Sequence, residues 1–217
     1  KLLTLPDGLT SIGMDAFYNC TNLTSVTFPA SLTSIGSFAF KGCSKLTGVT
    51  FPDGLTSIGE QAFCGCAELT SVTFPEGLTS IHWGAFYRCG LTGDLAFPTS
   101  LTSIGGCAFY KCSGFKGCTL ELPEGLECVE RETFYLCGFS KISVPASVTE
   151  IEPYGLYCGT NGGADIYFSG SSPIVTTAYN KDPSFSPDST LYFDLEKTGW
   201  VDSSCYDSST GKWCGYK

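Results

Sequence analysis

The chain has 217 residues, and 42% of them are hydrophobic, which is enough for one elongated domain. Its formal net charge of −9 argues against nucleic acid or an anionic membrane as a partner. No uninterrupted apolar stretch reaches the roughly 18 residues that a membrane-spanning helix needs, so no membrane insertion is expected.

A repeat with a period of 23 residues organises most of the chain. In each copy a proline is followed by an Ala-Phe pair and then by a cysteine. The copies of the pair are Ala16-Phe17, Ala39-Phe40, Ala62-Phe63, Ala85-Phe86 and Ala108-Phe109. A period of about 20–29 residues is typical of leucine-rich repeats, in which each unit has an apolar side that only a neighbouring unit covers. The pattern therefore predicts a solenoid of stacked coils, and it favours surface recognition over catalysis.

The first part of a repeat, Leu23–Phe28, has the residues of a half-buried strand. Polar and apolar side chains alternate over its last four residues, and Thr, Val and Phe all favour strands. Pro29 ends the strand because it has no N–H group to donate. Strands of successive coils are expected to pair in parallel at about 4.8 Å and to form a long sheet on one side of the solenoid.

The rest of the repeat is expected to contain a second short extended piece and a helical turn. Leu32 and Ile35 belong to the extended piece, and Gly36 marks a corner. The apolar residues within Ala39–Cys43 have the spacing of one helical turn that faces the core. The predicted fold class is therefore α/β, a leucine-rich repeat solenoid with a parallel-sheet horseshoe and short helical turns.

Residues 1–159 are predicted to form an array of about seven coils, and residues 160–217 the last coil and an atypical C-terminal cap. From about Thr160 the repeat fails, although Ile166–Phe168 and Leu191–Phe193 still resemble strands. A terminal unit has one uncovered side, so a changed sequence is expected there. The chain begins in the middle of a repeat, which indicates a fragment of a longer array.

The 13 cysteines need a separate explanation. Such a number is typical of an oxidising compartment, yet most of these cysteines share one repeat position. Neighbours in that column are about one strand spacing apart, too far for the roughly 3.8 Å between the Cβ atoms of a disulfide. We therefore expect buried, reduced thiols at Cys20, Cys43, Cys66, Cys89 and Cys112. Cys205 and Cys214 bracket a polar turn, and for this pair a disulfide and free thiols are both open.

The repeat resembles the BspA-like leucine-rich repeat, a family that includes treponemal surface proteins. The phrase L-T-S-V-T-F-P-x-x-L-T-S-I-G-x-x-A-F-x-x-C carries the resemblance, in the copies Leu23–Cys43, Leu46–Cys66 and Leu69–Cys89. The resemblance implies a secreted or surface-attached protein without a catalytic motif or cofactor. It also implies adhesion to host proteins such as fibronectin, or to other cells.

The residues themselves offer little for catalysis or metal binding. His82 is the only histidine and stands at a corner position that other repeats fill with glycine. The pair Cys64 and Cys66 is too closely spaced for a usual zinc motif. The stretch Gly159–Gly163 lacks the Lys-Ser/Thr and the helix of a phosphate-binding loop. We therefore predict no enzyme, no metal site and no cofactor.

Two surfaces are candidates for recognition. Threonines recur along the predicted strands, where they also serve simply as good strand formers. Aromatic residues stand instead at variable repeat positions near the predicted helical turns, either as an interface or as half-buried side chains between coils. This predicted binding surface consists of Trp83, Tyr87, Tyr110 and Tyr135.

The leading prediction is a non-catalytic extracellular or cell-surface binding module for adhesion or protein–protein interaction. Its expected partner is an unknown protein or glycan, with the host extracellular matrix as one source. A structural spacer that presents another domain and a carbohydrate-binding module are the alternatives. A solenoid fold does not itself name the ligand, because specificity resides in surface residues.

Overall fold

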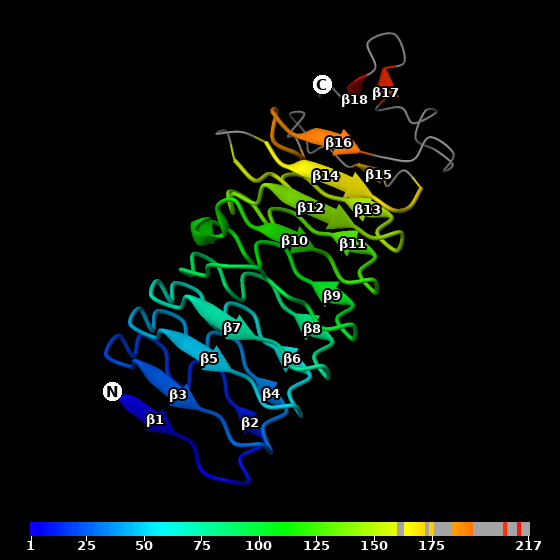
Figure 1. Ribbon diagram of the computed structural model, residues 1–217. Coiled ribbons are helices and arrows are strands. Elements are labelled where there is room, and N and C mark those ends of the chain that lie inside the picture. The colour runs from blue at the N-terminus through cyan, green and yellow to red at the C-terminus, as the bar shows by residue number, and fades with distance from the viewer. Residues whose placement is uncertain (160–162, 172–173, 176–183, 193–205, 208–211, 214–217) are drawn as a thin grey trace.

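The computed structural model describes residues 1–159, 163–171, 174–175, 184–192, 206–207 and 212–213. The chain winds into a β-solenoid of about 8 turns. β1 (Leu2–Thr4) lies at one end of the stack, and β16 (Thr190–Tyr192) follows the coils towards the other (Figure 1). Each coil contributes to three sides, which we call the sheet face, the short-strand face and the turn wall.

The sheet face is formed by the strand that opens each repeat. β1 pairs with β3 (Ser25–Thr27), and β5 (Gly48–Thr50) pairs with β7 (Ser71–Thr73), both in parallel. Further along, β10 (Thr119–Glu121), β12 (Lys141–Val144), β14 (Asp165–Phe168) and β16 form one parallel sheet. The prediction of parallel strands with a repeat-length register is confirmed, as in the pair Val49 and Val72.

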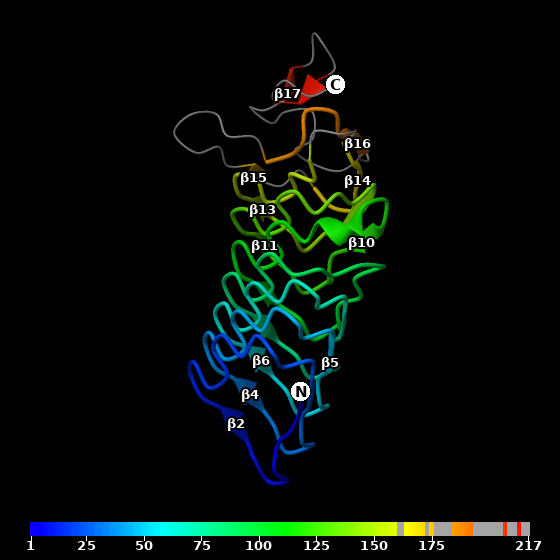
Figure 2. The same cartoon turned by 90° about the vertical axis from the view of Figure 1, so that its left-hand side faces the viewer.

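The short-strand face is formed by the second extended piece. Its first sheet contains β2 (Ser11–Ile12), β4 (Ser34–Ile35), β6 (Ser57–Ile58), β8 (Ser80–Ile81) and β9 (Ser103–Ile104). Its second contains β11 (Cys128–Val129), β13 (Glu150–Ile151) and β15 (Ile174–Val175). The rows of both faces run along the stack in Figures 1 and 2.

The turn wall corrects the helical part of the prediction. It comprises residues 14–20, 37–43, 60–66, 83–89, 106–112, 131–137 and 153–158, and all of them are turns or irregular segments rather than helix. In the described part of the chain the one helix is a 3₁₀ turn, Ser113–Phe115. The fold is therefore a β-solenoid, without the helical turns that an α/β class requires.

The reason lies in the backbone of the wall. Phe38 and Gly42 have φ values of 59° and 77°, which no right-handed helix accommodates. Alternate N–H groups donate to the next coil, as from Phe40 N to Ala62 O at 2.7 Å, instead of to a residue four positions back. The wall is thus held together by hydrogen bonds between coils. Its Phe and Cys side chains still lie in the core, at the same sequence spacing that one helical turn would give.

Stacked phenylalanines fill the core. Phe40 and Phe63 have ring centroids 5.2 Å apart with planes 4° from parallel, and Phe63 and Phe86 repeat this at 5.4 Å and 3°. A second row from the sheet face meets the first edge-on, as in the pair Phe51 and Phe63 at 5.7 Å. Repeating one aromatic per coil therefore produces a continuous core, in which each ring contacts the coils on both sides.

The cysteine column is buried as predicted, except at its first member. Cys43 and Cys66 are inaccessible to solvent, whereas Cys20, in the first coil, is exposed because only one coil packs against it. Each buried thiol also donates to a phenylalanine carbonyl of the preceding coil, with Cys66 Sγ 3.3 Å from Phe40 O. Cysteine at this position therefore combines a small apolar volume with a donor for a buried carbonyl.

The end of the chain is described in part. β14 and β16 confirm the strands expected near Ile166 and Leu191, and they continue the parallel sheet. β17 (Tyr206–Asp207) and β18 (Lys212–Trp213) pair in antiparallel fashion. Cys205 and Cys214, and most of the residues assigned to a cap, lie outside the described residues. The disulfide and the division at residue 159 remain predictions.

Candidate binding surface

The turn wall gathers three of the predicted aromatic residues into one stack. Tyr87 and Tyr110 are parallel, with ring centroids 4.5 Å apart and planes at 1°. Tyr110 and Tyr135 follow at 5.1 Å and 21°. Each tyrosine comes directly after the core phenylalanine of its coil, so the rigid phenylalanine row determines where the tyrosines lie.

The sequence analysis missed two members of this cluster. Tyr157 stacks on Tyr135 at 5.3 Å and 29°, and Tyr154 meets both rings edge-on. We call Tyr87, Tyr110, Tyr135 and Tyr157 the tyrosine ladder. In the last coil Leu156 replaces the phenylalanine, and Tyr157 is next to Cys158 rather than two residues before it. Because of this changed spacing, Tyr157 did not match the repeat pattern of the other ladder tyrosines in the sequence.

Trp83 does not join the ladder. Its side chain is 45% exposed at the corner where its coil enters the turn wall, and it has no ring contact with another described aromatic residue. The indole instead approaches the backbone of the next coil, within 3.4 Å of the place that a Cβ atom on Gly106 would occupy. Trp83 is therefore a separate exposed apolar group at the start of its turn-wall segment.

Basic side chains border the ladder. The guanidinium of Arg88 lies 5.4 Å from the ring centroid of Tyr87, and Nζ of Lys111 lies 5.2 Å from that of Tyr110. Cation–π contacts of this kind hold long side chains in place beside aromatic rings. Neither Arg88 nor Lys111 forms an ion pair with a carboxylate that the structure describes; the salt bridge found there joins Arg131 to Glu132 at 3.3 Å.

Arg88 and Lys111 also occupy unfavourable backbone positions. Their φ values are 55° and 57°, and the equivalent position in two earlier coils is Gly42 or Gly65. Glycine adopts this left-handed conformation without cost, whereas other residues lose about 1–2 kcal/mol. The coils that carry the first two ladder tyrosines therefore have basic residues where glycine would be more stable. The same left-handed conformation recurs at Asn19 and Leu136, the equivalent residues of two other coils, so it is a property of the repeat position rather than of the basic residues.

The ladder hydroxyls lack protein acceptors, and the pKa values of two of them are raised. Burial raises the pKa of Tyr87 above its ordinary value, and the neighbouring Tyr110 adds to this. Burial likewise raises the pKa of Tyr135, with further contributions from Tyr110 and Tyr157. Within the described residues, none of the ladder hydroxyls hydrogen bonds to another protein group. These hydroxyls are therefore available as donors.

Threonines in the sheet and short-strand faces have a different role. The hydroxyl of Thr47 donates to Thr24 O at 3.2 Å, and that of Thr56 donates to Thr33 O at 3.2 Å. The backbone N–H of each of these threonines donates to the same carbonyl. Their hydroxyls thus reinforce the bonding between coils. The threonine at the end of a sheet-face strand, such as Thr50 in β5, is exposed and makes no such bond to a described residue.

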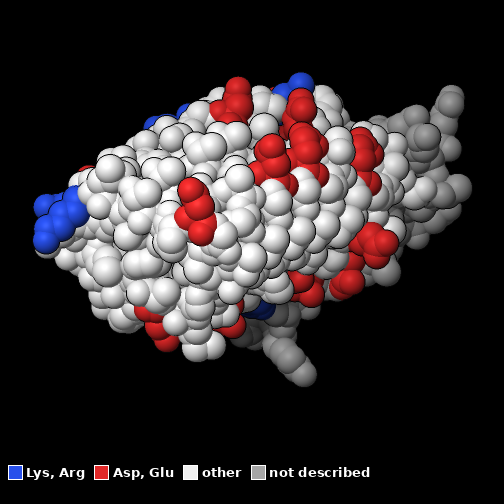
Figure 3. All heavy atoms as spheres, turned by 90° about the horizontal axis from the view of Figure 1, so that it is seen from below, with Lys and Arg blue, Asp and Glu red and all other residues white. Residues whose placement is uncertain are grey.

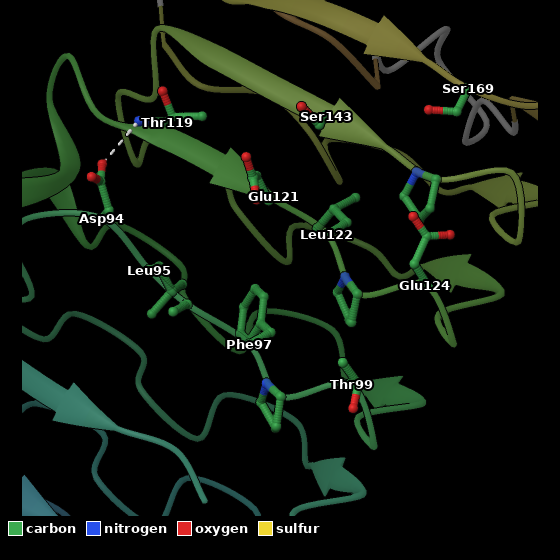
Figure 4. A pocket seen from close by; sticks show the side chains of 14 residues that line it. Asp94, Leu95, Phe97, Thr99, Thr119, Glu121, Leu122, Glu124, Ser143 and Ser169 are labelled. Carbon is green, nitrogen blue, oxygen red and sulfur yellow. Dashed lines mark hydrogen bonds between the residues drawn. The ribbon is translucent and has the colours of Figure 1, made fainter. Parts of the chain in front are cut away.

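A groove on the sheet face is a second concave feature, away from the tyrosines. It has a volume of about 590 Å³ and lies where the row of strands is interrupted between β7 and β10 (Figure 4). Gly93, with φ of 78°, bends the chain there, and the Asp94 carboxylate accepts the Thr119 N–H at 3.4 Å. Glu121 and Glu124 add acidic groups to the lining. The Asp94 carboxylate therefore takes the place of a backbone acceptor where the row of strands is interrupted.

Comparison with known proteins shows which family this geometry represents. The model of the BspA type leucine rich repeat region matches residues 1–116 and 85–172, with six copies. The chain belongs to the BspA-type leucine-rich repeat family. The resemblance that the sequence indicated is thus confirmed, and a search of the curated proteins found no match.

Solved structures include bacterial relatives of this BspA-type protein. A leucine rich repeat protein from T. pallidum shares 33% identity and a TM-score of 0.60, over 68% of this chain and 74% of that chain. A leucine-rich repeat protein from Bacteroides ovatus is 23% identical with a TM-score of 0.67, over 89% and 60%. A leucine rich cell surface protein from Faecalibacterium prausnitzii is 26% identical with a TM-score of 0.50, over 87% and 62%. The chain thus spans 60% of the B. ovatus protein's length.

The chain is thus a repeat protein of the BspA type, in a fold that generally serves as a binding scaffold. Among the described residues, no cluster of His, Cys, Asp and Glu side chains is suited to a metal ion. No helix in the described ranges is both long and apolar enough to cross a membrane.

Proposed function

We propose that this chain is a non-catalytic binding module displayed outside a bacterial cell, where it mediates adhesion or another protein–protein interaction. Its contact surface is the tyrosine ladder with the neighbouring Trp83. The observation that carries the proposal is the stack of Tyr87, Tyr110 and Tyr135, whose hydroxyls face no described protein acceptor.

The physical argument concerns rigidity and residue type. Tyr, Trp and Arg dominate the energetics of protein interfaces, and side chains that are already ordered lose little entropy on binding. Each inner tyrosine of the ladder is held between two other rings, and Arg88 is held against Tyr87. The exposed threonines offer nearly the same group on every strand, which gives little basis for discriminating partners. The stacked tyrosines of the ladder, in contrast, occur only in the later coils.

The surface location of a Faecalibacterium relative supports an extracellular role, because that protein is a leucine rich cell surface protein. We therefore propose that the partner is an extracellular macromolecule. A host extracellular-matrix protein is the first candidate to test. Binding of this kind requires no cofactor and no chemistry on the partner.

The experiment measures binding of the purified chain to a panel of purified extracellular-matrix proteins that includes fibronectin. Tyr110→Ala removes the ring that lies between Tyr87 and Tyr135. Tyr18→Ala is the matched control, because Tyr18 holds the equivalent position in the first coil, is 47% exposed and has no ring contact with a described residue. We expect Tyr110→Ala to weaken binding at least about tenfold and Tyr18→Ala to leave it unchanged.

A thermal melt of both variants shows whether either substitution has disturbed the fold. Equal binding by the folded Tyr110→Ala variant and the unaltered chain would exclude the ladder as the contact surface. Absence of binding to every protein of the panel would contradict the proposed class of partner.

A further inference from the structure

We infer that the tyrosine ladder recognises an acidic, extended polypeptide segment of its partner; this inference rests on the function proposed above. The geometry of the rings provides the first argument. Each inner ring is stacked face to face with its neighbours, so its two faces are covered. Edges and hydroxyls remain at the surface. An aromatic edge carries partial positive charge, and a protonated phenol donates a hydrogen bond, so both favour an anionic acceptor.

Charge provides the second argument. The molecule is acidic overall, with a formal charge of −9, and the face in Figure 3 shows more Asp and Glu than Lys and Arg. Arg88 and Lys111 nevertheless lie in successive coils of the turn wall, where Arg88 N–H donates to Tyr110 O at 2.8 Å. No described carboxylate forms an ion pair with either. Two unpaired cations at the ladder therefore attract negative charge locally.

The acidic groups that face this region are engaged in the fold. Glu132, on the next coil, is paired with Arg131 and accepts the Cys107 thiol at 3.5 Å. Glu130 accepts the Gly106 N–H at 2.7 Å. Both carboxylates contact the coil that carries Tyr110, through Gly106 and Cys107, and neither forms an ion pair with Arg88 or Lys111.

The shape of the ladder favours an extended chain as the occupant. Its ring centroids follow one another at 4.5, 5.1 and 5.3 Å along the stack. Successive side chains of an extended peptide alternate in direction, so a peptide laid along the ladder presents a carboxylate to it at every second residue, about 6.6 Å apart. Flexible Asp and Glu side chains at that spacing can each reach a hydroxyl of the row. A neutral sugar instead stacks its apolar side on an open ring face, and the inner ladder rings have none.

The test uses a fluorescein-labelled peptide of alternating Asp and Glu, with a peptide of Asn and Gln in the same order as its neutral control. Binding to the full chain is followed by fluorescence anisotropy. We expect the acidic peptide alone to bind, and raising the salt from about 0.05 M to about 0.5 M to weaken it at least about tenfold.

Charge-matched variants locate the site. The double variant Arg88→Gln with Lys111→Gln retains both side-chain stems, and we expect it to lose about tenfold in affinity. Lys45→Gln with Lys116→Gln removes the same charge from exposed positions that contact no described ring, and we expect less than about a twofold change. Tyr110→Phe keeps the stack and removes one hydroxyl, and we expect a loss of about threefold.

Several results would overturn the inference. They are no binding of the acidic peptide, an equal loss in the two double variants, and binding of an anionic polysaccharide such as dextran sulfate without binding of the peptide. A matrix protein whose affinity falls with Tyr110→Ala, but not with salt or with the Arg88 and Lys111 double variant, would also overturn it. That last result would leave the proposed binding surface standing.

Discussion

The sheet face and the turn wall are built by the same repeat, yet their polar groups are used differently. On the sheet face the hydroxyl of Thr47 donates to the preceding coil, and the same bond recurs at Thr70. On the turn wall the hydroxyl of Tyr110 has no described protein partner. Residues that repeat in every coil thus serve the stacking of coils. Residues that appear in only a few coils, such as Tyr110, have polar groups that are available to a binding partner.

The core that both faces share gives the largest expected effect. Phe63→Ala should lower the free energy of unfolding by about 3–5 kcal/mol, because its fully buried ring lies between Phe40 and Phe86 and leaves a cavity. Phe17→Ala, in the first coil, should cost clearly less, because Phe17 is only partly buried and stacks on one ring. Urea denaturation measures both values. A loss below about 1 kcal/mol for Phe63→Ala would show that this ring is not part of the stacked core.

The buried thiols make the stack sensitive to alkali. Burial raises the pKa of Cys112 from 9.0 to about 12, so this thiol ionises more readily in the unfolded chain than in the folded one. Its stabilising contribution is therefore complete below about pH 9 and decreases as the pH rises towards 12. Between about pH 9 and pH 10 this one thiol should account for about 1 kcal/mol of lost stability.

The control is Cys112→Ser, which does not ionise in this range. Unfolding by urea at a series of pH values should give a shallower decline for the serine variant. The same decline in both proteins would contradict the burial of an ionisable thiol at this position.

A smaller effect on stability should distinguish threonines that donate a hydrogen bond to the preceding coil from threonines that do not. Thr56→Val removes a hydroxyl that donates to Thr33 O, and should cost about 0.5–1 kcal/mol of stability. Thr50→Val removes an exposed hydroxyl that makes no hydrogen bond to a described residue, and should be neutral within about 0.5 kcal/mol. Chemical denaturation of the pair tests this. Equal free energies of unfolding for the two variants would mean that the hydrogen bond from Thr56 to Thr33 contributes nothing to stability.

The smallest effect is expected to be a gain. Arg88→Gly relieves a left-handed residue with φ of 55° and should stabilise the fold by about 0.5–1 kcal/mol. The same change should weaken binding to an acidic segment. Thermal melting with a parallel binding assay measures both quantities. A variant that is less stable would show that the arginine stem contributes more packing than its backbone conformation costs.

The parallel strands and the phenylalanine core could be predicted from the sequence because both depend on residues that repeat in register. Phe40, Phe63 and Phe86 form one column, and side chains that recur at one position of a solenoid pack on one another in successive coils. The turn wall was predicted wrongly because the spacing of Phe40 and Cys43 suits a helical turn as well as a chain of left-handed turns. Gly42 and Gly65, between those two positions, were the signal against a helix.

The candidate site was predicted in part for a related reason. Tyr87, Tyr110 and Tyr135 follow a core phenylalanine, so their common position was visible in the sequence. The shortened last coil hid Tyr157. The part proposed for Arg88 could not be predicted from the sequence, because its contact with Tyr87 and its lack of an ion pair with a described carboxylate are features of three-dimensional arrangement.

The most direct test of the central claim measures the affinity of one macromolecular partner for Tyr87→Ala and for Thr50→Ala by titration calorimetry. The account predicts a loss of about 1–3 kcal/mol for Tyr87→Ala and almost none for Thr50→Ala, because the tyrosine is a rigid interface residue and the threonine is one of a uniform series. The reverse ranking, with Thr50 essential and Tyr87 silent, would place recognition on the sheet face and contradict the account.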